Sequence, residues 1–249
     1  MYFFLTQLTM LDILTISDIV PAMLHVLLNN GISISLLGCI TQLFFFGFSE
    51  ASECLLLTVM SYDRYLAICH ALHYHSIMNP MFCLKSILLC WLLGFTVTFV
   101  QTVNLSQLHF CWSNIIDHFF CDFDPVLKLS CSNIWKIKLI SLFMGFSIIV
   151  CPFFIVVISY VYITHTILRI QSTTGRQKAF STCGSHLAVV SIFYGTLFTI
   201  YLFPEKGKSI VLRKVLSIVY TVVTPLVNPV IYCLRKKDIK KALKKINIY

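Results

Sequence analysis

Charged residues are scarce in this sequence of 249 residues. They make up 12% of the chain, compared with about 25% in soluble domains. Hydrophobic residues make up 58%, and the mean hydropathy is +0.85. This balance excludes an ordinary soluble domain and indicates a membrane protein.

Motifs of the common enzyme classes are absent as well. The chain has no His-Glu-x-x-His zinc motif, no Gly-x-Ser-x-Gly nucleophile elbow and no glycine-rich phosphate loop. It has no Gly/Ser linker and no fixed-period repeat, and it lacks the internal symmetry of a transporter built from repeated halves. We therefore predict a single domain over residues 1–249 that is not an enzyme, with a transporter as the less favoured alternative.

Long apolar stretches predict six membrane-spanning helices. About 20 residues are needed to cross roughly 30 Å of hydrocarbon as a helix. The first stretch is too long for the apolar core of a signal peptide. The six stretches lie at about 2–28, 39–62, 82–103, 139–163, 183–203 and 212–234.

Lysine and arginine predict which side of the membrane each end occupies. An even number of spans places both ends on one side, and short segments rich in Lys and Arg stay inside. The tail at 235–249 holds seven basic residues, and the loop before the fifth span adds Arg169, Arg176 and Lys178. We predict a cytoplasmic C-terminus. These basic residues suit anionic lipid headgroups, which favours the lipid bilayer as a partner over nucleic acid.

The tail itself has an amphipathic pattern. Apolar residues share one side of a helix and lysines share the other, which predicts a short helix on the membrane surface. A solvated basic tail is the alternative. The apolar residues are Ile239, Ala242, Leu243 and Ile246.

Cysteines mark the one long polar connection, at about residues 104–138. Cys111, Cys121 and Cys131 lie in it, together with the sequon that begins at Asn104, and Cys39 lies at the outer end of the second span. Disulfides and glycosylation suit an extracellular, oxidising face, so we predict that this connection is outside and that Asn104 is glycosylated. Four cysteines allow three pairings, and the residues alone leave the choice open.

Six motifs, in order, carry a resemblance to a known family. They are Met60–Cys69 (MSYDRYLAIC), His118–Asp122 (HFFCD), Leu127–Cys131 (LKLSC), Lys178–Cys183 (KAFSTC), Phe193–Thr196 (FYGT) and Pro225–Tyr232 (PLVNPVIY). The chain resembles the olfactory receptors of the rhodopsin-like, G-protein-coupled class. It departs from them at Ala71, where the family usually has proline, and at Ala22, where a lysine is common. The Lys178–Cys183 motif and the cysteine-rich outer connection disfavour a non-olfactory receptor of the same class.

The resemblance implies an all-α transmembrane bundle, the seven-helix receptor fold with only helices two to seven present. It implies an odorant receptor of the plasma membrane that binds small volatile or water-borne organic molecules in a transmembrane cavity. Such a receptor activates a stimulatory, olfactory-type heterotrimeric G protein and raises cyclic AMP. Met1–Leu5 (MYFFL) and Leu8–Asp12 (LTMLD) resemble the opening of the family's second helix. We therefore expect that this chain alone does not signal, since a missing helix would expose Asp12 to lipid.

The resemblance also assigns the outer disulfides and the odorant cavity. It pairs Cys39 with Cys121 and Cys111 with Cys131. A stripe of apolar and aromatic residues is by spacing alone more typical of helix packing, but the resemblance places these positions around a small apolar pocket. The positions are Phe46, Gly47, Glu50, Ala51, Met144, Ile148, Tyr194, Phe198 and Tyr201.

Three carboxylates fall inside the predicted spans, where ionisable residues are costly and usually functional. Glu50 and Glu53 share one helix face, and the resemblance places Asp12 opposite Glu53. Two carboxylates in a low dielectric repel, so either one is protonated or a cation lies between them. The sodium site of rhodopsin-like receptors favours Na⁺ at Asp12 and Glu53. For Glu50 we hypothesise contact with a protonated amine or another hydrogen-bond donor in the cavity, the alternative being a neutral acid or a third member of the ion site.

The resemblance assigns a switch to the inner ends of the helices. Asp63 holds Arg64 until activation releases it to Tyr160, although an arginine here also suits the inner membrane boundary. Asn228 and Pro229 form a hinge, because proline removes one helix hydrogen bond. The residues assigned to activation and coupling are Asp63, Arg64, Tyr65, Tyr160, Lys178, Asn228, Pro229 and Tyr232.

Overall fold

The computed structural model describes residues 2–29, 31–111, 115–202 and 209–233. The chain divides into two compact units, Met1–Tyr162 and Ile163–Tyr249, and each is described by itself. Among the described residues, five helices are long and apolar enough to cross a membrane, and a shorter apolar stretch runs from Lys214 to Asn228. The only strand pairing in these residues is an isolated bridge, which confirms the predicted all-α class.

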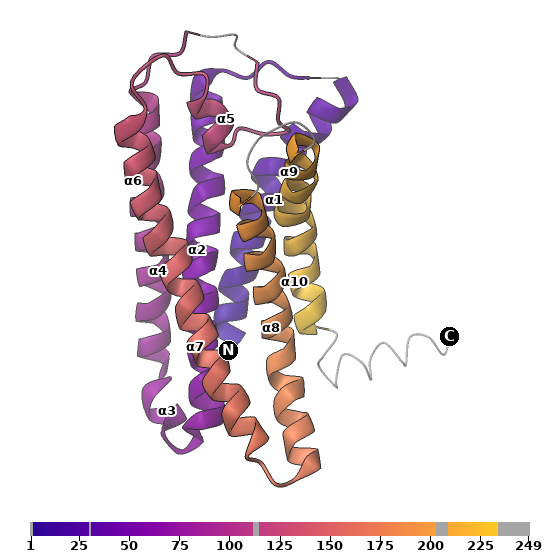
Figure 1. Ribbon diagram of the computed structural model, residues 1–249. Helices are drawn as coiled ribbons and strands as arrows, with labels where there is room; N and C mark the ends of the chain where they lie inside the picture. The colour runs from indigo at the N-terminus through magenta and orange to yellow at the C-terminus, as the bar shows by residue number, and fades with distance from the viewer. Residues whose placement is uncertain (1, 30, 112–114, 203–208, 234–249) are drawn as a thin grey trace, which may run out of the picture. The chain divides into compact units, whose positions relative to one another are not determined.

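In the first unit, α2 is the core helix (Figure 1). It packs against both α1 and α4, and α4 also packs against α6. Over the most apolar 18 residues of each helix, 56% are buried in α2, 28% in α1 and 22% in α4. The helices are α1 (Tyr2–Asn29), α2 (Leu36–Cys69), α4 (Pro80–Ser106) and α6 (Trp135–Gly145), which continues through η2 (Phe146–Val150) into α7 (Cys151–Leu168).

Local sequence determines where α2 and α4 begin. Ser35 caps α2 by accepting a hydrogen bond from Gly38 N at 3.1 Å. Asn79 caps α4 by accepting from Phe82 N at 2.8 Å, and Pro80 supplies a first residue that needs no hydrogen-bond acceptor. The inner connection between the two helices consists of η1 (Ala71–His73) and α3 (Tyr74–Ile77).

Small residues bring α2 and α4 close together. A Cβ atom on Gly94 would overlap Ser52 Oγ and lie 3.1 Å from Ser52 N. One turn and a half along α2, a Cβ on Gly47 would lie 3.1 Å from Thr98 Cγ2. Glycine at these positions permits the close approach. Aromatic contacts flank the seam at Phe44–Phe95, Phe48–Trp91 and Phe48–Phe95.

Two π-helical turns each end two residues before a proline. The turn η2 precedes Pro152, and η3 (Val219–Val223) precedes Pro225. Proline has no N–H and its ring crowds the preceding turn, so a local change of helical pitch accommodates it. At the second site Val219 O accepts two hydrogen bonds from Thr224, one from its backbone N–H and one from its hydroxyl at 3.1 Å.

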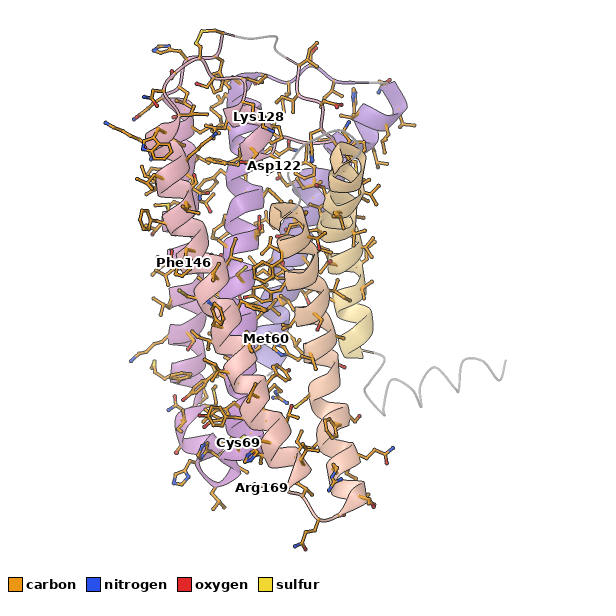
Figure 2. All side chains as sticks on the ribbon, in the orientation of Figure 1. Met60, Cys69, Asp122, Lys128, Phe146 and Arg169 are labelled. Atoms are coloured by element: carbon orange, nitrogen blue, oxygen red, sulfur yellow. A yellow bond between two sulfur atoms is a disulfide. The ribbon has the colours of Figure 1, made fainter. Side chains whose placement is uncertain are left out.

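The outer connection is held down by a buried apolar cluster. Its helix α5 (Phe123–Leu127) is flanked by Asp122 and Lys128 (Figure 2). Asp122 caps the helix, because its carboxylate accepts from Phe123 N at 2.8 Å. The cluster draws on α2, α4, α5 and α6, so the connection is fixed to the ends of three long helices. Its buried members are Cys39, Leu43, Leu105, Cys121, Val126, Leu127 and Ile137.

The second unit contains α8 (Thr173–Leu202), α9 (Ser209–Ile218), η3 and α10 (Thr224–Cys233). Helices α8 and α10 pack against each other. The ring of Phe193 in α8 lies 5.6 Å from that of Tyr220 in η3, which joins the two segments. The predicted surface helix at 235–249 lies outside the described residues.

Candidate functional site

Asp63, at the inner end of α2, accepts hydrogen bonds from two neighbours. Its Oδ1 accepts from Tyr74 OH at 2.9 Å, and its Oδ2 accepts from Arg64 Nε at 3.0 Å and from Arg64 Nη2. Asp63 is fully buried, and the side chain of Arg64 is 11% exposed. A buried carboxylate is stable only when it is paired or hydrogen-bonded in this way. The structure therefore shows the arginine held by its neighbour.

Tyr74, the first residue of α3, connects the inner loop to this pair. Burial and the hydrogen bond to Asp63 raise the pKa of Tyr74 from 10.0 to about 12. A raised pKa means that the protonated donor is favoured, so its stabilising contribution is complete below about pH 10 and is lost only as the pH rises toward 12. The Tyr74 hydroxyl thus stays a hydrogen-bond donor throughout the physiological pH range.

Tyr65 lies in an aromatic group beside Arg64. Its hydroxyl is 2.9 Å from His70 Nε2, and its ring stacks on Tyr62 with centroids 6.2 Å apart. The ring of Tyr162, in α7, meets it edge-on at 6.0 Å. Tyr160 is buried in the same helix. The inner ends of α2 and α7 are therefore in contact through tyrosines.

Two carboxylates are buried half-way along the helices of the first unit. Asp12 of α1 is 2% exposed and Glu53 of α2 is 5% exposed, and these two helices pack together. Glu50 is half-buried one turn outward. Within the described ranges there is no group of three or more His, Cys, Asp or Glu side chains that could hold a metal ion. A cation between Asp12 and Glu53 would therefore need further oxygen ligands from other groups.

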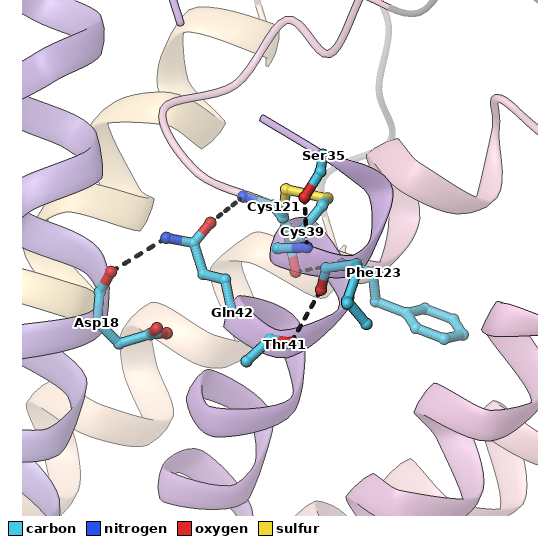
Figure 3. The surroundings of a disulfide bond; sticks show 10 residues. Asp18, Ser35, Cys39, Thr41, Gln42, Cys121 and Phe123 are labelled. Atoms are coloured by element: carbon cyan, nitrogen blue, oxygen red, sulfur yellow. Dashed lines mark hydrogen bonds between the residues drawn. A yellow bond between two sulfur atoms is a disulfide. The ribbon is translucent and has the colours of Figure 1, made fainter. Parts of the chain in front are cut away.

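Two disulfides and one glutamine hold the outer end of the first unit. Cys39 is bonded to Cys121 and Cys111 to Cys131, the pairs that the family resemblance implies. The side chain of Gln42 bridges α1 and the outer connection (Figure 3). Its Nε2 donates to Asp18 O at 3.0 Å, and its Oε1 accepts from Cys121 N at 2.9 Å.

The family follows from comparison with known proteins. Residues 1–248 match the family model described as "Olfactory receptor". The chain belongs to the olfactory receptor family. It is 46% identical to olfactory receptor 6B2 of Homo sapiens over 245 aligned residues. The aligned residues make up 98% of this chain and 78% of that relative. It is 44% identical to olfactory receptor 6B3 of Homo sapiens, over 98% of this chain and 74% of the relative, and 44% identical to olfactory receptor 1468 of Rattus norvegicus, over 98% and 77%.

Membership confirms the resemblance carried by the six motifs. It makes this protein an odorant-sensing, G-protein-coupled receptor of the membrane, and not an enzyme.

The receptor's predicted odorant positions in the first unit differ in their surroundings. The ring of Phe46 is buried and meets Phe120 of the outer connection at 5.3 Å. Gly47 instead faces Thr98 of α4 and serves the packing of two helices. Of the other positions, Ala51 and Ile148 are buried, and Glu50 and Met144 are half-buried.

In the second unit, the receptor's predicted residues are distributed along α8 and α10. Tyr194 is buried in α8, and its ring stacks on that of Phe198 at 6.1 Å. Lys178 is exposed near the start of α8, and Asn228 is buried in α10. The side chains of Tyr201, Pro229 and Tyr232 lie outside the described residues.

Asn104 lies in the last turn of α4, which continues to Ser106, so the outer connection begins later than predicted. Its side-chain nitrogen, the atom that a glycan would occupy, donates to Val100 O at 2.7 Å. Glycosylation of this residue stays a prediction, and a glycan would leave this nitrogen a single N–H with which to keep the hydrogen bond.

Sequence reasoning missed two residues that hold the receptor together, Tyr74 and Gln42. Tyr74 belongs to the inner loop and lies 11 residues after Asp63, so no helical spacing predicts their contact. Gln42 offered a signal, because an uncharged polar residue within an apolar span usually bonds to a neighbouring helix or loop.

Replacing Gln42 with leucine is expected to destabilise the receptor by about 1–3 kcal/mol, because the buried N–H of Cys121 loses its acceptor. The midpoint of thermal unfolding of purified receptor in detergent would measure the loss. Thr41→Val is the matched control, since the Thr41 hydroxyl bonds to Leu37 O in its own helix. Equal midpoints for the two variants would contradict the bridging role.

Proposed function

We propose that this receptor detects small organic odorants at the plasma membrane, with its C-terminus in the cytoplasm, and activates a stimulatory, olfactory-type G protein that raises cyclic AMP. The observation that carries the proposal is the bonded group of Asp63, Arg64 and Tyr74 at the inner end of α2. An arginine held by a neighbouring carboxylate and a loop tyrosine is an element with two states, because a partner protein can replace these contacts.

The same helix carries the outer contacts. Cys39 ties α2 to the outer connection, and Phe46 packs under Phe120. One continuous helix, Leu36–Cys69, therefore links the outer half of the first unit to the group that holds Arg64. This continuity supports the transfer of a ligand-induced shift to the inner face.

The odorant site is proposed around the outer half of α2, at Phe46, Glu50 and Ala51. Two of these side chains are buried and Glu50 is half-buried, so the site combines apolar surface with one polar group. Small organic ligands suit such surroundings. Met144 and Ile148 stay predicted members of this site, and Tyr194, Phe198 and Tyr201 of the second unit stay predicted odorant positions.

For the buried pair Asp12 and Glu53, the proposal is a bound sodium ion. Their burial on packed helices supports it, because a bound cation stabilises the ionised form of carboxylates that are removed from water. Replacing sodium by choline in the medium should shift the odorant dose response of the wild type and leave that of Asp12→Asn unchanged. A shift of the same size in both proteins would exclude the sodium site.

The experiment that tests the function is an odorant screen in cells that express, at their surface, the receptor with a first membrane helix added to residues 1–249, because the chain alone is expected not to signal. An active odorant should raise cyclic AMP in cells that contain the stimulatory α subunit, and the response should disappear in cells that lack it. A response that persists without this subunit would refute the choice of G protein.

The orientation of the receptor in the membrane is tested separately. An antibody to a tag at the C-terminus should bind only after the cells are permeabilised.

Glu50→Gln is expected to reduce responses to amines selectively. Glu50 is half-buried at the proposed odorant site, and a carboxylate there can form a charge-assisted hydrogen bond with the protonated nitrogen of an amine. Loss of a charge-assisted hydrogen bond of about 1.5–3 kcal/mol corresponds to roughly a tenfold to hundredfold loss of potency. Dose responses to amines and to alcohols of the same carbon skeleton would be compared, and equal losses in both classes, or none, would contradict the idea.

A further inference from the structure

The two disulfides of the outer connection lie in opposite surroundings. Cys39 and Cys121 are 4% and 3% exposed, and they form part of the buried apolar cluster with Leu43 and Leu105. Cys111 and Cys131 are both exposed. A dissolved thiol can approach the second pair directly, whereas the first pair is reached only if the cluster opens.

The exposed pair is also held by contacts that do not depend on the S–S bond. Cys131 N donates to His109 O at 3.0 Å, and Cys111 N donates to Leu129 O at 3.4 Å. Phe110 and Ser130 form an antiparallel bridge between these contacts. Side chains add to the pairing, as His109 N donates to Ser132 Oγ and Ser130 Oγ donates to His109 O.

We infer that Cys111–Cys131 is a redox-sensitive clasp on the outer face, which opens by exchange with small thiols while Cys39–Cys121 stays closed. The attacking thiolate bonds to one sulfur of the pair, and the other cysteine leaves as a thiolate that takes a proton from water. A second thiol then displaces the first as a disulfide. The clasp gains two electrons and becomes two thiols, and two small thiols are oxidised to one disulfide.

The hydrogen-bonded pairing makes the opening reversible. Segments 109–111 and 129–132 remain aligned after the S–S bond is broken, so the two thiols stay close and form the bond again once an oxidant is present. An exposed disulfide without such pairing would separate on reduction and mispair more readily.

The clasp closes a stretch of chain that ends near the proposed odorant site. Phe120 lies within the stretch between Cys111 and Cys131, and its ring meets the ring of Phe46 edge-on. Opening the clasp leaves this stretch tied down at Cys121 and by the apolar cluster, but it removes one constraint on the cover over Phe46. We expect odorant potency to shift, and this consequence rests on the proposed function, whereas the chemistry of the clasp does not.

The decisive experiment treats membranes that contain the native receptor with a series of glutathione and glutathione disulfide mixtures. Free thiols are alkylated at timed intervals, and peptides with each of the four cysteines are quantified by mass spectrometry. Cys111 and Cys131 should be alkylated at least about tenfold faster than Cys39 and Cys121. Equal rates, earlier opening of the buried pair, or opening of Cys111–Cys131 only after denaturation would overturn the inference.

Two variants separate the chemistry from its consequence. In Ser130→Ala the clasp should form again more slowly after removal of thiol, while Ser147→Ala, which loses a hydroxyl bonded to Met144 O in its own segment, should match the wild type. Equal rates in all three would refute the role of the pairing.

In a responding receptor, the double variant C111S/C131S should show the odorant potency of thiol-treated wild type, and thiol should not change this potency further. A thiol effect that persists in the double variant would refute the link between the clasp and the odorant response.

Discussion

Gly94→Leu is expected to remove folded receptor from the cell surface. Even a single Cβ at this position overlaps Ser52 Oγ and lies 3.1 Å from Ser52 N, so a leucine must push α4 away from α2. Overpacking of a tight core costs about 1–3 kcal/mol or more, and about 3 kcal/mol lowers the ratio of folded to unfolded protein by roughly a hundredfold. Surface labelling and thermal unfolding in detergent would both measure the effect.

Gly145→Leu is the matched control, because a Cβ there meets no atom within 4 Å. This variant should reach the surface as the wild type does. A milder variant tests the contact itself, since Gly94→Ala clashes chiefly with the Ser52 hydroxyl, which makes no hydrogen bond in the structure. Adding Ser52→Gly should restore part of the stability that Gly94→Ala loses. If it does not, the contact between Ser52 and Gly94 does not limit how closely α2 and α4 approach.

The sequence predicted the elements that depend on local pattern. Apolar length predicts the helices α1, α2 and α4. The motif around Arg64 placed the inner group on α2, and Asp63 is in contact with Arg64, the pairing that the family resemblance implies.

What the sequence did not predict depends on contacts between distant segments. The contact between Gly47 and Thr98 is one of these, because the rotation of α2 is set by its packing against α4, and the place of Gly47 in the odorant cavity stays a prediction. Asn104 was placed in a loop, but α4 continues past it. The π turns before Pro152 and Pro225 likewise have no sequence signature beyond the prolines themselves.

Asp63→Asn is expected to raise the basal activity of the receptor several-fold while odorants still evoke a response. The carboxylate is fully buried and accepts hydrogen bonds from both Arg64 and Tyr74. An amide keeps the size of the side chain but loses the charge that holds the guanidinium. A hydrogen bond to a charged group contributes about 1.5–3 kcal/mol, so its loss shifts an equilibrium between resting and active states by about tenfold or more.

Tyr74→Phe keeps this prediction testable if the Asp63 variant folds poorly. It removes one donor and leaves the pair of Asp63 and Arg64 in place, so the expected rise in basal cyclic AMP is smaller and in the same direction. Tyr62→Phe is the matched control, since Tyr62 is exposed and lies on α2 next to Asp63. Basal cyclic AMP would be measured per receptor at the cell surface. If both Asp63→Asn and Tyr74→Phe gave wild-type basal levels at normal surface expression, the group around Asp63 would be a structural anchor rather than a switch.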